Sequence, residues 1–336
     1  MGIKMKMKIG ICGYGNLGRG IEAEINKNAD MELAAIFTRR KPAASLVINS
    51  DTPVMHVDDI ADWKHGHNQP RKIDVLILCG GSAVDLPEQS PLMAGHFNIV
   101  DSFDTHAKIP AHKKSVHAAA AAAGNIAVIS AGWDPGFFSL LRLYSGAILP
   151  SGTSGSFWGY GVSQGHSDAV RRIAGVTGAI QYSIPQEEAI EKARQGKAAN
   201  LSPREKHKRL CYVATEPDAD RVRIEKEIKE MPNYFADYDT DVVFISLDEL
   251  AKNHSRFPHG GKVIHTGQTG DGNRQAIELS LKLDSNPEFT ASFMLASARA
   301  ACRMSREGLT GAKTVFDIPP AYFSPLGDDE MVRLLL

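Results

Sequence analysis

Apolar residues divide the chain into two regions with different periodicities. In the first region, up to residue 132, five short and mainly apolar runs are separated by polar or helical stretches. These runs cover residues 9–12, 33–37, 73–78, 98–100 and 126–129. Runs of this kind are typical of parallel strands that are buried on both faces. From Trp133 on, segments such as 276–283 alternate apolar and polar residues, which predicts antiparallel strands with one solvated face.

A glycine-rich loop follows the first apolar run. Residues 13–18 read Gly-Tyr-Gly-Asn-Leu-Gly, and a helix is expected from Arg19 to Lys27 before the second run. In a strand–loop–helix unit with this spacing, the glycines permit a sharp turn, the close approach of a pyrophosphate and tight packing of helix on strand. The unpaired N–H groups at the start of the helix then face the phosphates. We therefore predict that a dinucleotide binds at Gly13, Tyr14, Gly15, Asn16, Leu17 and Gly18.

The residues after the second run distinguish between the two nicotinamide dinucleotides. A site for NAD usually has Asp or Glu at this point, which binds the 2′-hydroxyl group of the ribose. This chain has Thr38, Arg39 and Arg40 there. A carboxylate would repel a 2′-phosphate, whereas guanidinium and hydroxyl groups bind one. The sequence therefore predicts NADP as the cofactor.

The fold class that these patterns predict is α/β. A Rossmann dinucleotide-binding domain is expected at 1–132, and a second domain of α+β type, with a mixed or antiparallel sheet, is expected at 133–312. The second domain includes a long helix predicted at 291–306. The tail at 313–336 is expected to pack back on the first domain.

Three later strands of the first domain end in polar or glycine-rich loops. Ligands of open parallel sheets bind just outside the carboxyl ends of the strands, so these loops are candidates for cofactor binding. They contain Cys79, Gly80, Gly81, Ser82, Ser102, Phe103, Asp104, Ala131, Gly132, Trp133, Asp134 and Pro135. Asp104 and Asp134 should lie near the nicotinamide, although an Asp at such a position can also be a turn or cap residue. With His166 they are the candidates for a general base, and Asp134 is preferred.

Composition and charge argue against several other classes of protein. The formal net charge is −1, so no strongly basic surface is expected for nucleic acid. No apolar run approaches the roughly 20 residues of a membrane span, so no membrane partner is expected either. The four cysteines are scattered and the N-terminus does not resemble a signal peptide, which favours a cytoplasmic protein with reduced thiols. The histidines lack the spacing of zinc sites, so no metal is expected.

Six motifs together resemble one enzyme family. They are GYGNLGR at 13–19, FTRR at 37–40, GWDPG at 132–136, SQGHSDA at 163–169, MP at 231–232 and PHGG at 258–261. With these motifs in this order, nearly the whole chain resembles the meso-diaminopimelate dehydrogenases, the NADP-dependent amino-acid dehydrogenases of bacterial lysine biosynthesis. The motifs around Trp133 and Gln164 are specific to this family, whereas the glycine loop is shared by many.

The resemblance implies a reaction and a set of site residues. The D-configured centre of meso-2,6-diaminopimelate would be oxidised to L-2-amino-6-oxopimelate with release of ammonia, by a homodimer that binds substrate between its two domains. Asp104 and Asp134, with Trp133 beside them, would meet the reacting end. Trp158 would wall the substrate channel, and Gln164 and Gly165 would hold the reacting end. The residues implied for the distal end are Ser183, Arg209, His259 and Asn286.

The resemblance has two departures, and alternatives stay open. The family usually has Thr where Ser183 stands, and often Thr-Tyr-Asp where this chain has Ser102-Phe103-Asp104. Without the resemblance, Arg209 would be assigned to a solvated basic face, because Lys206, His207 and Lys208 precede it. The main alternative function is another two-domain NADP-dependent oxidoreductase acting on a related D-amino acid or 2-keto acid. A non-catalytic NADP-binding regulator is less consistent with the polar strand ends.

Overall fold

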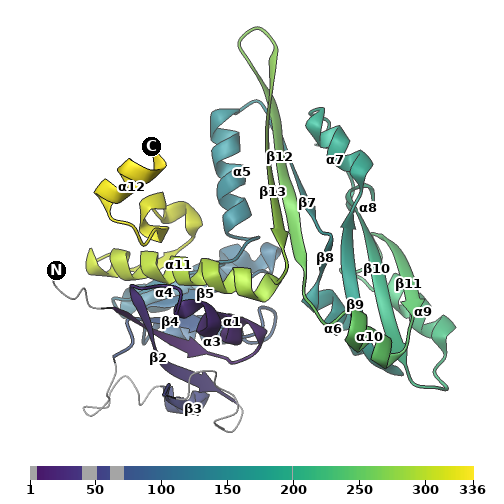
Figure 1. The fold of residues 1–336 in the computed structure, drawn as a ribbon, viewed down its shortest axis with the longest axis horizontal. Helices are drawn as coiled ribbons and strands as arrows, with labels where there is room; N and C mark the ends of the chain where they lie inside the picture. Colours follow the sequence, from purple (N-terminus) through teal and green to yellow (C-terminus); the bar gives the residue numbers. More distant parts are fainter. Residues whose placement is uncertain (1–5, 40–50, 61–71, 199) are drawn as a thin grey trace. The chain divides into compact units, whose positions relative to one another are not determined.

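The computed structural model describes residues 6–39, 51–60, 72–198 and 200–336. The chain divides into two compact units (Figure 1). Unit 1 comprises Met1–Leu140 and Pro287–Leu336, and unit 2 comprises Leu141–Asn286. In the described part of the chain, no helix is long and apolar enough to cross a membrane.

Unit 1 is built on a parallel sheet. Seven strands of the described residues form it in the order β14-β6-β5-β4-β1-β2-β3, and each neighbouring pair is parallel. The strands are β1 (Met7–Cys12), β2 (Met31–Thr38), β3 (Val54–His56), β4 (Val75–Leu78), β5 (Ile99–Asp101), β6 (Ile126–Val128) and β14 (Gly311–Lys313). This doubly wound order has the central β1 and β4 side by side, and it confirms the Rossmann-type fold that the apolar runs predicted.

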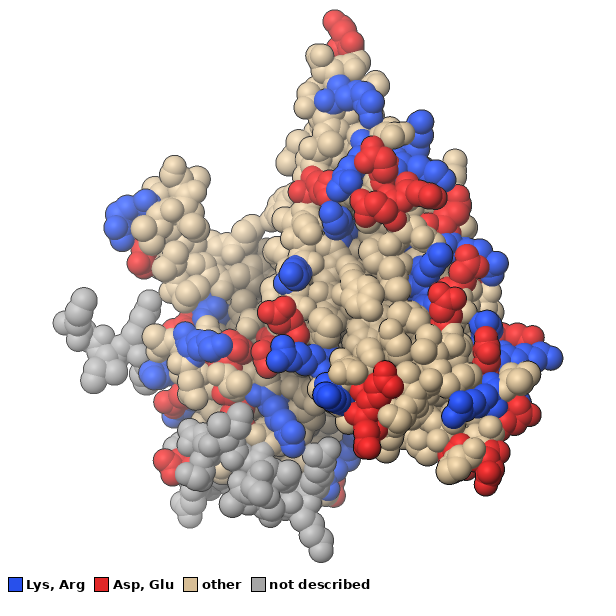
Figure 2. Space-filling model, turned by 45° about the vertical axis from the view of Figure 1, so that its right-hand side comes forward, with Lys and Arg blue, Asp and Glu red and all other residues tan. Residues whose placement is uncertain are grey.

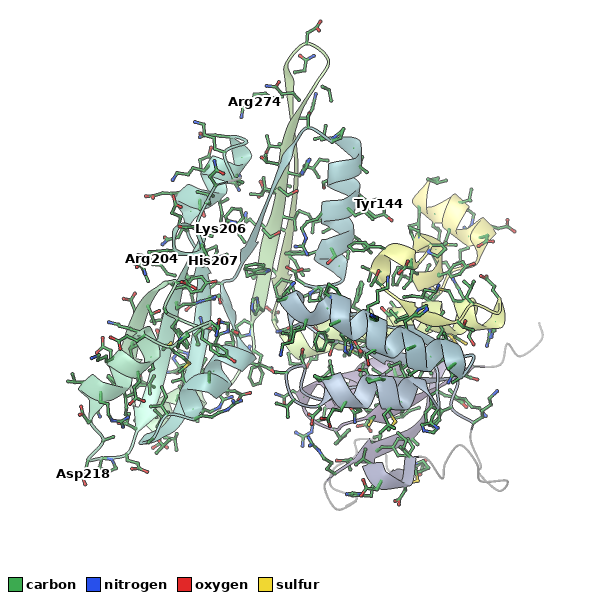
Figure 3. All side chains as sticks on the ribbon, turned by 180° about the vertical axis from the view of Figure 1, so that it is seen from behind. Tyr144, Arg204, Lys206, His207, Asp218 and Arg274 are labelled. Atoms are coloured by element: carbon green, nitrogen blue, oxygen red, sulfur yellow. The ribbon has the colours of Figure 1, made fainter. Side chains whose placement is uncertain are left out.

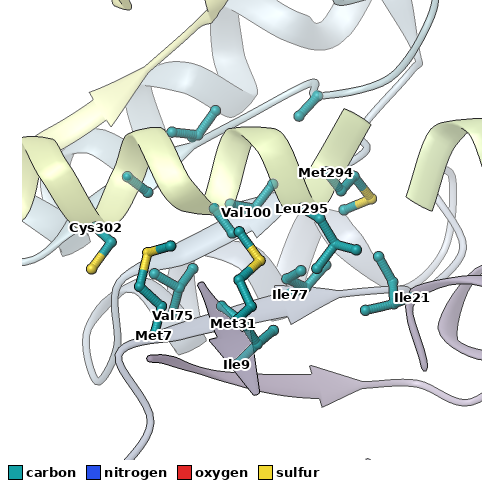
Figure 4. Close-up of a cluster of buried hydrophobic side chains, with 14 of the residues drawn as sticks. Met7, Ile9, Ile21, Met31, Val75, Ile77, Val100, Met294, Leu295 and Cys302 are labelled. Atoms are coloured by element: carbon teal, nitrogen blue, oxygen red, sulfur yellow. The ribbon is translucent and has the colours of Figure 1, made fainter. Parts of the chain in front are cut away.

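Helices cover both faces of this sheet, which is why its strands are apolar throughout. Along β4, Val75 and Ile77 belong to one buried cluster and Leu76 and Leu78 to another. The first cluster, shown in Figure 4, also contains side chains of α1 (Asn16–Ile25) and α11 (Asn286–Arg306). The second contains side chains of α3 (Leu86–Ala94) and α4 (Ile109–Ala122).

Helix α11 belongs to unit 1, whereas the sequence analysis assigned it to the second domain. Met294, Leu295 and Ala298 are buried against the parallel sheet, and Arg299 pairs with Asp30 at an Nε–Oδ2 distance of 2.6 Å. The apolar spacing of a helix shows that one face is buried but not against which sheet, so the sequence could not place this helix. The structure divides the chain before Pro287, whereas the predicted second domain extends to 312. The following tail contains η4 (Val315–Asp317), η5 (Pro320–Phe323) and α12 (Asp328–Leu335).

Unit 2 contains two smaller sheets. One has four strands in the order β11-β10-β9-β8, and the other has three in the order β13-β12-β7, counted over the described residues. The strands are β7 (Thr153–Trp158), β8 (Gly161–Val162), β9 (Val176–Pro185), β10 (His207–Thr215), β11 (Asp239–Phe244), β12 (His259–Thr269) and β13 (Asn273–Leu283). Only the β10–β11 pair is parallel among these, so the prediction of a mixed or antiparallel sheet is confirmed.

Short helices pack against these two sheets. They are α6 (Gln164–Arg171), α7 (Glu187–Arg194), α8 (Pro203–Lys206), α9 (Arg221–Lys229) and α10 (Leu247–Asn253). Helix α5 (Phe137–Ile148) begins in unit 1 and continues in unit 2. On the face that Figure 2 presents, positive and negative side chains alternate without a large patch of one sign, as the small net charge predicted.

Candidate active site

The glycine loop lies between β1 and α1, as the spacing predicted. Gly13 has φ +98°, and a Cβ there would lie 3.2 Å from the carbonyl group of Cys79. A Cβ at Gly18 would lie 2.2 Å from the carbonyl oxygen of Gly13, so helix and loop require glycine. A Cβ at Gly15 would meet nothing within 4 Å, and this residue begins the helix. The loop therefore presents backbone N–H groups to open space, where an anion can approach them.

Side chains of the same loop are not all available to a cofactor. Tyr14 is buried, and its hydroxyl group donates a hydrogen bond to Glu22 of α1. Its ring belongs to the core of unit 1, and the guanidinium carbon of Arg19 lies 5.7 Å from the ring centroid. The side chain of Tyr14 thus fixes the loop on its helix, which leaves the backbone of Tyr14 as the group that can face a phosphate.

A cavity of about 480 Å³ lies beside the end of β2 within unit 1. Gly13, Thr38, Arg39 and Asp85 contribute to its lining. The Arg39 side chain is 75% exposed and pairs with Asp85 at an Nη1–Oδ1 distance of 3.1 Å. An exposed ion pair of this kind contributes little free energy, about 0–1 kcal/mol, so a phosphate can displace the carboxylate from Arg39. Arg40 lies outside the described residues.

The loops after β4 and β5 are joined by hydrogen bonds. The backbone N–H of Asp104 donates to Ser82 Oγ at 2.8 Å. The backbone N–H of Gly81 donates to Asp85 Oδ2 at 2.7 Å, which orders the glycine pair of the β4 loop. The ring of Phe103 is buried, so a cofactor could contact only the backbone of this residue.

The loop after β6 is a tight turn that leads into α5. Gly132 accepts a hydrogen bond from the N–H of Phe137 at 2.9 Å. Trp133 is buried and packs edge-on against Phe138, with ring centroids 5.3 Å apart. Asp134 is half-buried. Asp104 and Asp134 therefore both follow carboxyl ends of neighbouring strands, because β5 and β6 pair directly. The structure thus brings the two predicted carboxylates to one edge of one sheet.

Unit 2 contains the second group of predicted residues, and two of them, Ser183 and Arg209, lie on one face of its four-stranded sheet. Ser183 of β9 lies directly opposite Arg209 of β10, and Gly161 of β8 lies opposite Ser183. Residues opposite each other in a ladder point to the same side of the sheet, and the Arg209 guanidinium donates a hydrogen bond to Ser183 Oγ. Arg209 also lies over the ring of Tyr238, with its guanidinium carbon 3.9 Å from the centroid.

Arg209 is buried, contrary to the solvated basic face that its own neighbourhood in the sequence suggested. In β10 the exposed Lys208 alternates with the buried His207 and Arg209, as the period of two requires. Among the described residues no carboxylate interacts with Arg209, and its Nε atom is buried without a hydrogen-bond partner. Burial lowers the pKa of this guanidinium, although it remains charged. A buried cation in this state favours an anionic ligand.

The start of α6 carries a second polar atom without a partner. The Nε2 atom of Gln164 is buried and makes no hydrogen bond to the described residues. The helix is held on the sheet by Ser167, whose Oγ accepts from the N–H of Gln181 at 2.9 Å. A Cβ at Gly165 would meet nothing within 4 Å, so the backbone beside Gln164 is open to a ligand.

His207 is a residue of this site that the sequence analysis missed. Its Nε2 accepts a hydrogen bond from the N–H of Trp158 at 2.8 Å, and the two rings stack with centroids 5.2 Å apart. Figure 3 labels His207 beside Arg204 and Lys206, where α8 joins β10. The alternation along β10 was the signal that could have identified it, since His207 and Arg209 are two residues apart.

Three histidines of unit 2 are neutral near neutral pH. Burial lowers the pKa of His166 to about 3 and that of His207 to about 3, and the positive charge of Arg209 adds to both effects. Burial also lowers the pKa of His259, whose Nδ1 accepts from the N–H of Gly260 at 2.8 Å. His166 Nδ1 lies 2.7 Å from Ser163 Oγ. Of these four side chains, Arg209 is therefore the one that carries a charge near neutral pH.

The remaining predicted residue is Asn286, the last residue of unit 2. Its backbone N–H donates to the carbonyl oxygen of Phe257 at 2.9 Å, which places it beside the segment that leads to His259. Clusters of His, Cys, Asp and Glu suited to a metal ion are lacking in the part of the chain that the structure describes.

Comparison with known proteins identifies the family. Residues 132–285 match the model of the diaminopimelic acid dehydrogenase C-terminal domain. The meso-diaminopimelate D-dehydrogenase of Ureibacillus thermosphaericus is 55% identical, over 98% of this chain and 99% of its own. That of Corynebacterium glutamicum is 46% identical, over 97% and 98%. The chain belongs to the meso-diaminopimelate D-dehydrogenase family.

Solved structures agree with this family. The C. glutamicum DAP dehydrogenase in complex with DAP is 45% identical and superimposes with a TM-score of 0.91, over 99% of this chain and 100% of the other. An engineered D-amino acid dehydrogenase bound to NADP⁺ is 44% identical, with a TM-score of 0.88 and the same coverage. The resemblance that the motifs indicated is thereby confirmed.

Proposed function

We propose that this member of the family catalyses the reversible, NADP-dependent oxidative deamination of the D-centre of meso-2,6-diaminopimelate. Water is consumed, and L-2-amino-6-oxopimelate, ammonia and NADPH are formed; the product cyclises to tetrahydrodipicolinate. Relatives that are 46–56% identical are named for the meso-diaminopimelate D-dehydrogenase activity. The observation in this chain that carries the proposal is the buried cation Arg209 of unit 2, whose Nε has no hydrogen-bond partner among the described residues and which suits a substrate with two carboxylates.

The residues of unit 1 fit NADP. The glycine loop offers N–H groups to the pyrophosphate, and Thr38 and Arg39 line the cavity where the adenosine 2′-phosphate would lie. Because Arg39 is mostly exposed, it can turn from Asp85 to the phosphate. An engineered relative binds NADP⁺, which supports the same cofactor here. When bound, the cofactor accepts the hydride from the substrate.

The two groups of side chains serve different ends of the substrate in this proposal. Asp104 and Asp134 of unit 1 hold the reacting amino group, and Asp134 accepts the proton that the ammonium group must lose before hydride transfer. Trp158, Gln164 and Gly165 orient the substrate, and Ser183 and Arg209 hold a distal carboxylate. His259 and Asn286 hold the distal amino group and carboxylate. We do not assign the proton transfer to His166, because its Nδ1 lies 2.7 Å from Ser163 Oγ and burial holds its pKa far below neutral.

The relative from Clostridium tetani supports the choice of these residues of unit 2. A solved variant of its meso-diaminopimelate dehydrogenase, in complex with DAP, carries six substitutions of Gln, Thr, Arg, Pro, His and Asn. Residues of these types occur here in the same order and with the same spacing, with Ser in place of Thr. They are Gln164, Ser183, Arg209, Pro258, His259 and Asn286.

The deciding experiment measures NADPH formation with the meso, LL and DD isomers of diaminopimelate, and NAD⁺ in place of NADP⁺ as the cofactor control. Turnover of the meso isomer with NADP⁺ is expected. Turnover of simple D-amino acids but not of the meso isomer would favour the alternative, a dehydrogenase for a related D-amino acid.

For the cofactor, Arg39→Ala combined with Arg40→Ala should raise the KM for NADP⁺ at least about tenfold and leave the KM for diaminopimelate nearly unchanged. Equal effects on both constants would refute a 2′-phosphate role.

We also propose that the protein is a homodimer that uses one face of the three-stranded sheet. Ser156 of β7 and Leu279 of β13 pair with the same residue of β12, so their side chains point to the same face of the sheet. Arg142 of α5 donates a hydrogen bond to Ser156 Oγ at 3.0 Å. Helix α5 therefore lies on this face, where Leu279 is only half-buried. Tyr144 and Ile148 of the same helix are 44% and 67% exposed, and Figure 3 shows Tyr144 projecting from α5. A second copy would remove these apolar groups from water.

Light scattering on the purified protein tests the dimer. Leu279→Lys should convert the dimer to a monomer, whereas Val222→Lys, at an apolar position of α9 that is 80% exposed, should leave it unchanged. A wild-type monomer at micromolar concentration would refute the proposal.

A further inference from the structure

A buried carboxylate lies at the carboxyl edge of the parallel sheet, behind the loops that carry Asp104 and Asp134. Asp101 is the last residue of β5 and is fully buried. Its Oδ1 accepts hydrogen bonds from two backbone N–H groups, that of Phe103 at 3.1 Å and that of Ser130 at 2.9 Å. Its own carbonyl oxygen accepts from the N–H of Ala131 at 2.8 Å. One residue therefore ties together the two loops that follow β5 and β6.

The other carboxylate oxygen of Asp101, Oδ2, contacts two polar side chains of the helices that pack on the sheet. Oδ2 accepts from Ser90 Oγ of α3 at 2.7 Å, and His112 Nε2 of α4 lies 2.7 Å from it. His112 is also buried, and its ring stacks on Phe103 at a centroid distance of 4.0 Å with planes 11° apart. The carboxylate thus has four partners, and two of them come from helices that pack on the sheet. Such a network, with every acceptor position used, holds the carboxylate group in one orientation.

The backbone conformation of the loop after β6 shows why a hydrogen-bond acceptor in a fixed position is useful there. Ser130 has φ +56°, a left-handed conformation that a residue with a side chain rarely adopts. The N–H of Ser130 donates a hydrogen bond to Asp101 Oδ1, and this bond stabilises the turn of the chain. The next residues are Ala131 to Asp134, whose placement follows from the turn. In the loop after β5, Phe103 immediately precedes Asp104. Asp101 Oδ1 therefore restrains the backbone of both segments that carry the predicted carboxylates.

We propose that Asp101, supported by His112, is a positioning residue for the reaction. It does not touch the substrate; it holds Asp104 and Asp134 at the spacing that proton transfer and hydride transfer require. This inference rests on the proposed function for its effect on turnover, but the restraint on the two loops can be measured without turnover. A misplacement of reacting groups by about 1 Å can reduce a rate of the order of a hundredfold.

Unit 1 provides a matched control at the opposite edge of the same sheet. Asp30 precedes β2 and accepts from Arg299 through Nε at 2.6 Å and Nη2 at 2.9 Å. Asp30→Asn weakens a charged pair in the same unit, far along the strands from the loops. Asp101→Asn removes the charge and replaces one acceptor oxygen by a donor. A second variant, His112→Phe, keeps the ring stacked on Phe103 but removes the donor to Oδ2.

The experiment combines hydrogen–deuterium exchange with steady-state kinetics on the full-length protein. In Asp101→Asn, amides in peptides 102–105 and 130–136 should exchange at least about tenfold faster, and kcat should fall by about 10- to 100-fold. The KM for NADP⁺ should change less than kcat, because the glycine loop and Thr38, which hold the phosphates in the proposed function, are untouched. His112→Phe should show a smaller change of the same pattern. Asp30→Asn should lower the melting temperature without either effect.

Two outcomes would overturn the inference. One is unchanged exchange and kcat in both Asp101→Asn and His112→Phe. The other is an equal loss of kcat, with equal loop exchange, in Asp30→Asn, which would show a general loss of stability instead of positioning. If Asp101→Asn does not fold, His112→Phe decides. If the wild type does not turn over diaminopimelate, the proposed function fails, and the exchange data still decide whether Asp101 restrains the loops.

Discussion

The buried charged side chains of the two units are satisfied in different ways. In unit 1 the buried carboxylate of Asp101 has four hydrogen-bond partners, and Arg299 binds Asp30, Asn28 and the carbonyl oxygen of Phe323. In unit 2 the buried groups of Arg209 and Gln164 keep atoms without partners in the described residues. We infer that the proposed reacting end is ordered before the substrate binds. At the proposed distal end, the charge of Arg209 would be neutralised only by a substrate carboxylate.

The largest expected effect concerns the carboxylates of unit 1. Asp134→Asn should lower kcat by about 10²- to 10⁴-fold with little change in the KM for diaminopimelate, because it removes a proton acceptor and keeps the shape. Asp104→Asn is the matched variant, and steady-state kinetics of both proteins decide the assignment. A larger loss of kcat in Asp104→Asn would reverse the two roles.

Arg209→Met should affect binding and stability in opposite directions. The KM for diaminopimelate should rise about 10- to 100-fold, because a charged hydrogen bond to a carboxylate is lost. The free protein should become more stable, since an uncompensated buried charge is removed. Arg299→Met is the control, and it should lower the free energy of unfolding by about 3 kcal/mol, because it leaves Asp30 unpaired. Denaturant unfolding without ligand measures both, and a destabilised Arg209→Met would contradict the comparison.

The buried histidines predict a pH dependence of stability that originates in unit 2. The pKa of His207 is lowered to about 3 in the folded protein, so the unfolded state binds the extra proton first as the pH falls below about 6.5. Stability is therefore complete above that pH and is lost toward pH 3, by up to about 2 kcal/mol per such histidine at pH 5. His207→Gln keeps an acceptor for the N–H of Trp158 and should flatten the profile. Urea unfolding at pH 5 and pH 7 measures this, and an unchanged slope would exclude His207 as a source.

The smallest expected effect is at the cofactor cavity. Asp85→Asn keeps an oxygen for the N–H of Gly81 but removes the charge that competes for Arg39. The KM for NADP⁺ should fall by at most about fivefold, as expected for an exposed ion pair. Initial rates at varied NADP⁺ test this, with Glu88→Gln, at another residue of the same cavity lining, as the control. A higher KM in Asp85→Asn would mean that Asp85 contributes to the site itself.

Local sequence was sufficient for the features that depend on neighbouring residues. The glycine spacing at 13–18 and the apolar run at 73–78 gave the dinucleotide-binding unit, because turn geometry and burial on both faces act within a few residues. The motifs around Trp133 and Gln164 gave the family. Arg209 could be placed only by resemblance, since a basic run on an unknown face can be solvated or buried.

The sequence by itself determined the cofactor-binding unit and the family, and it supplied the residues that we propose meet the substrate. Only the tertiary structure decided that α11 packs on unit 1, that His207 and Arg209 share a buried face, and that Asp101 joins two loops to His112. The physical reason is that these facts join residues from separate elements. The sequence of an amphipathic helix or of a lone Asp at a strand end indicates whether its surroundings are apolar or polar. It does not indicate which distant residues form those surroundings.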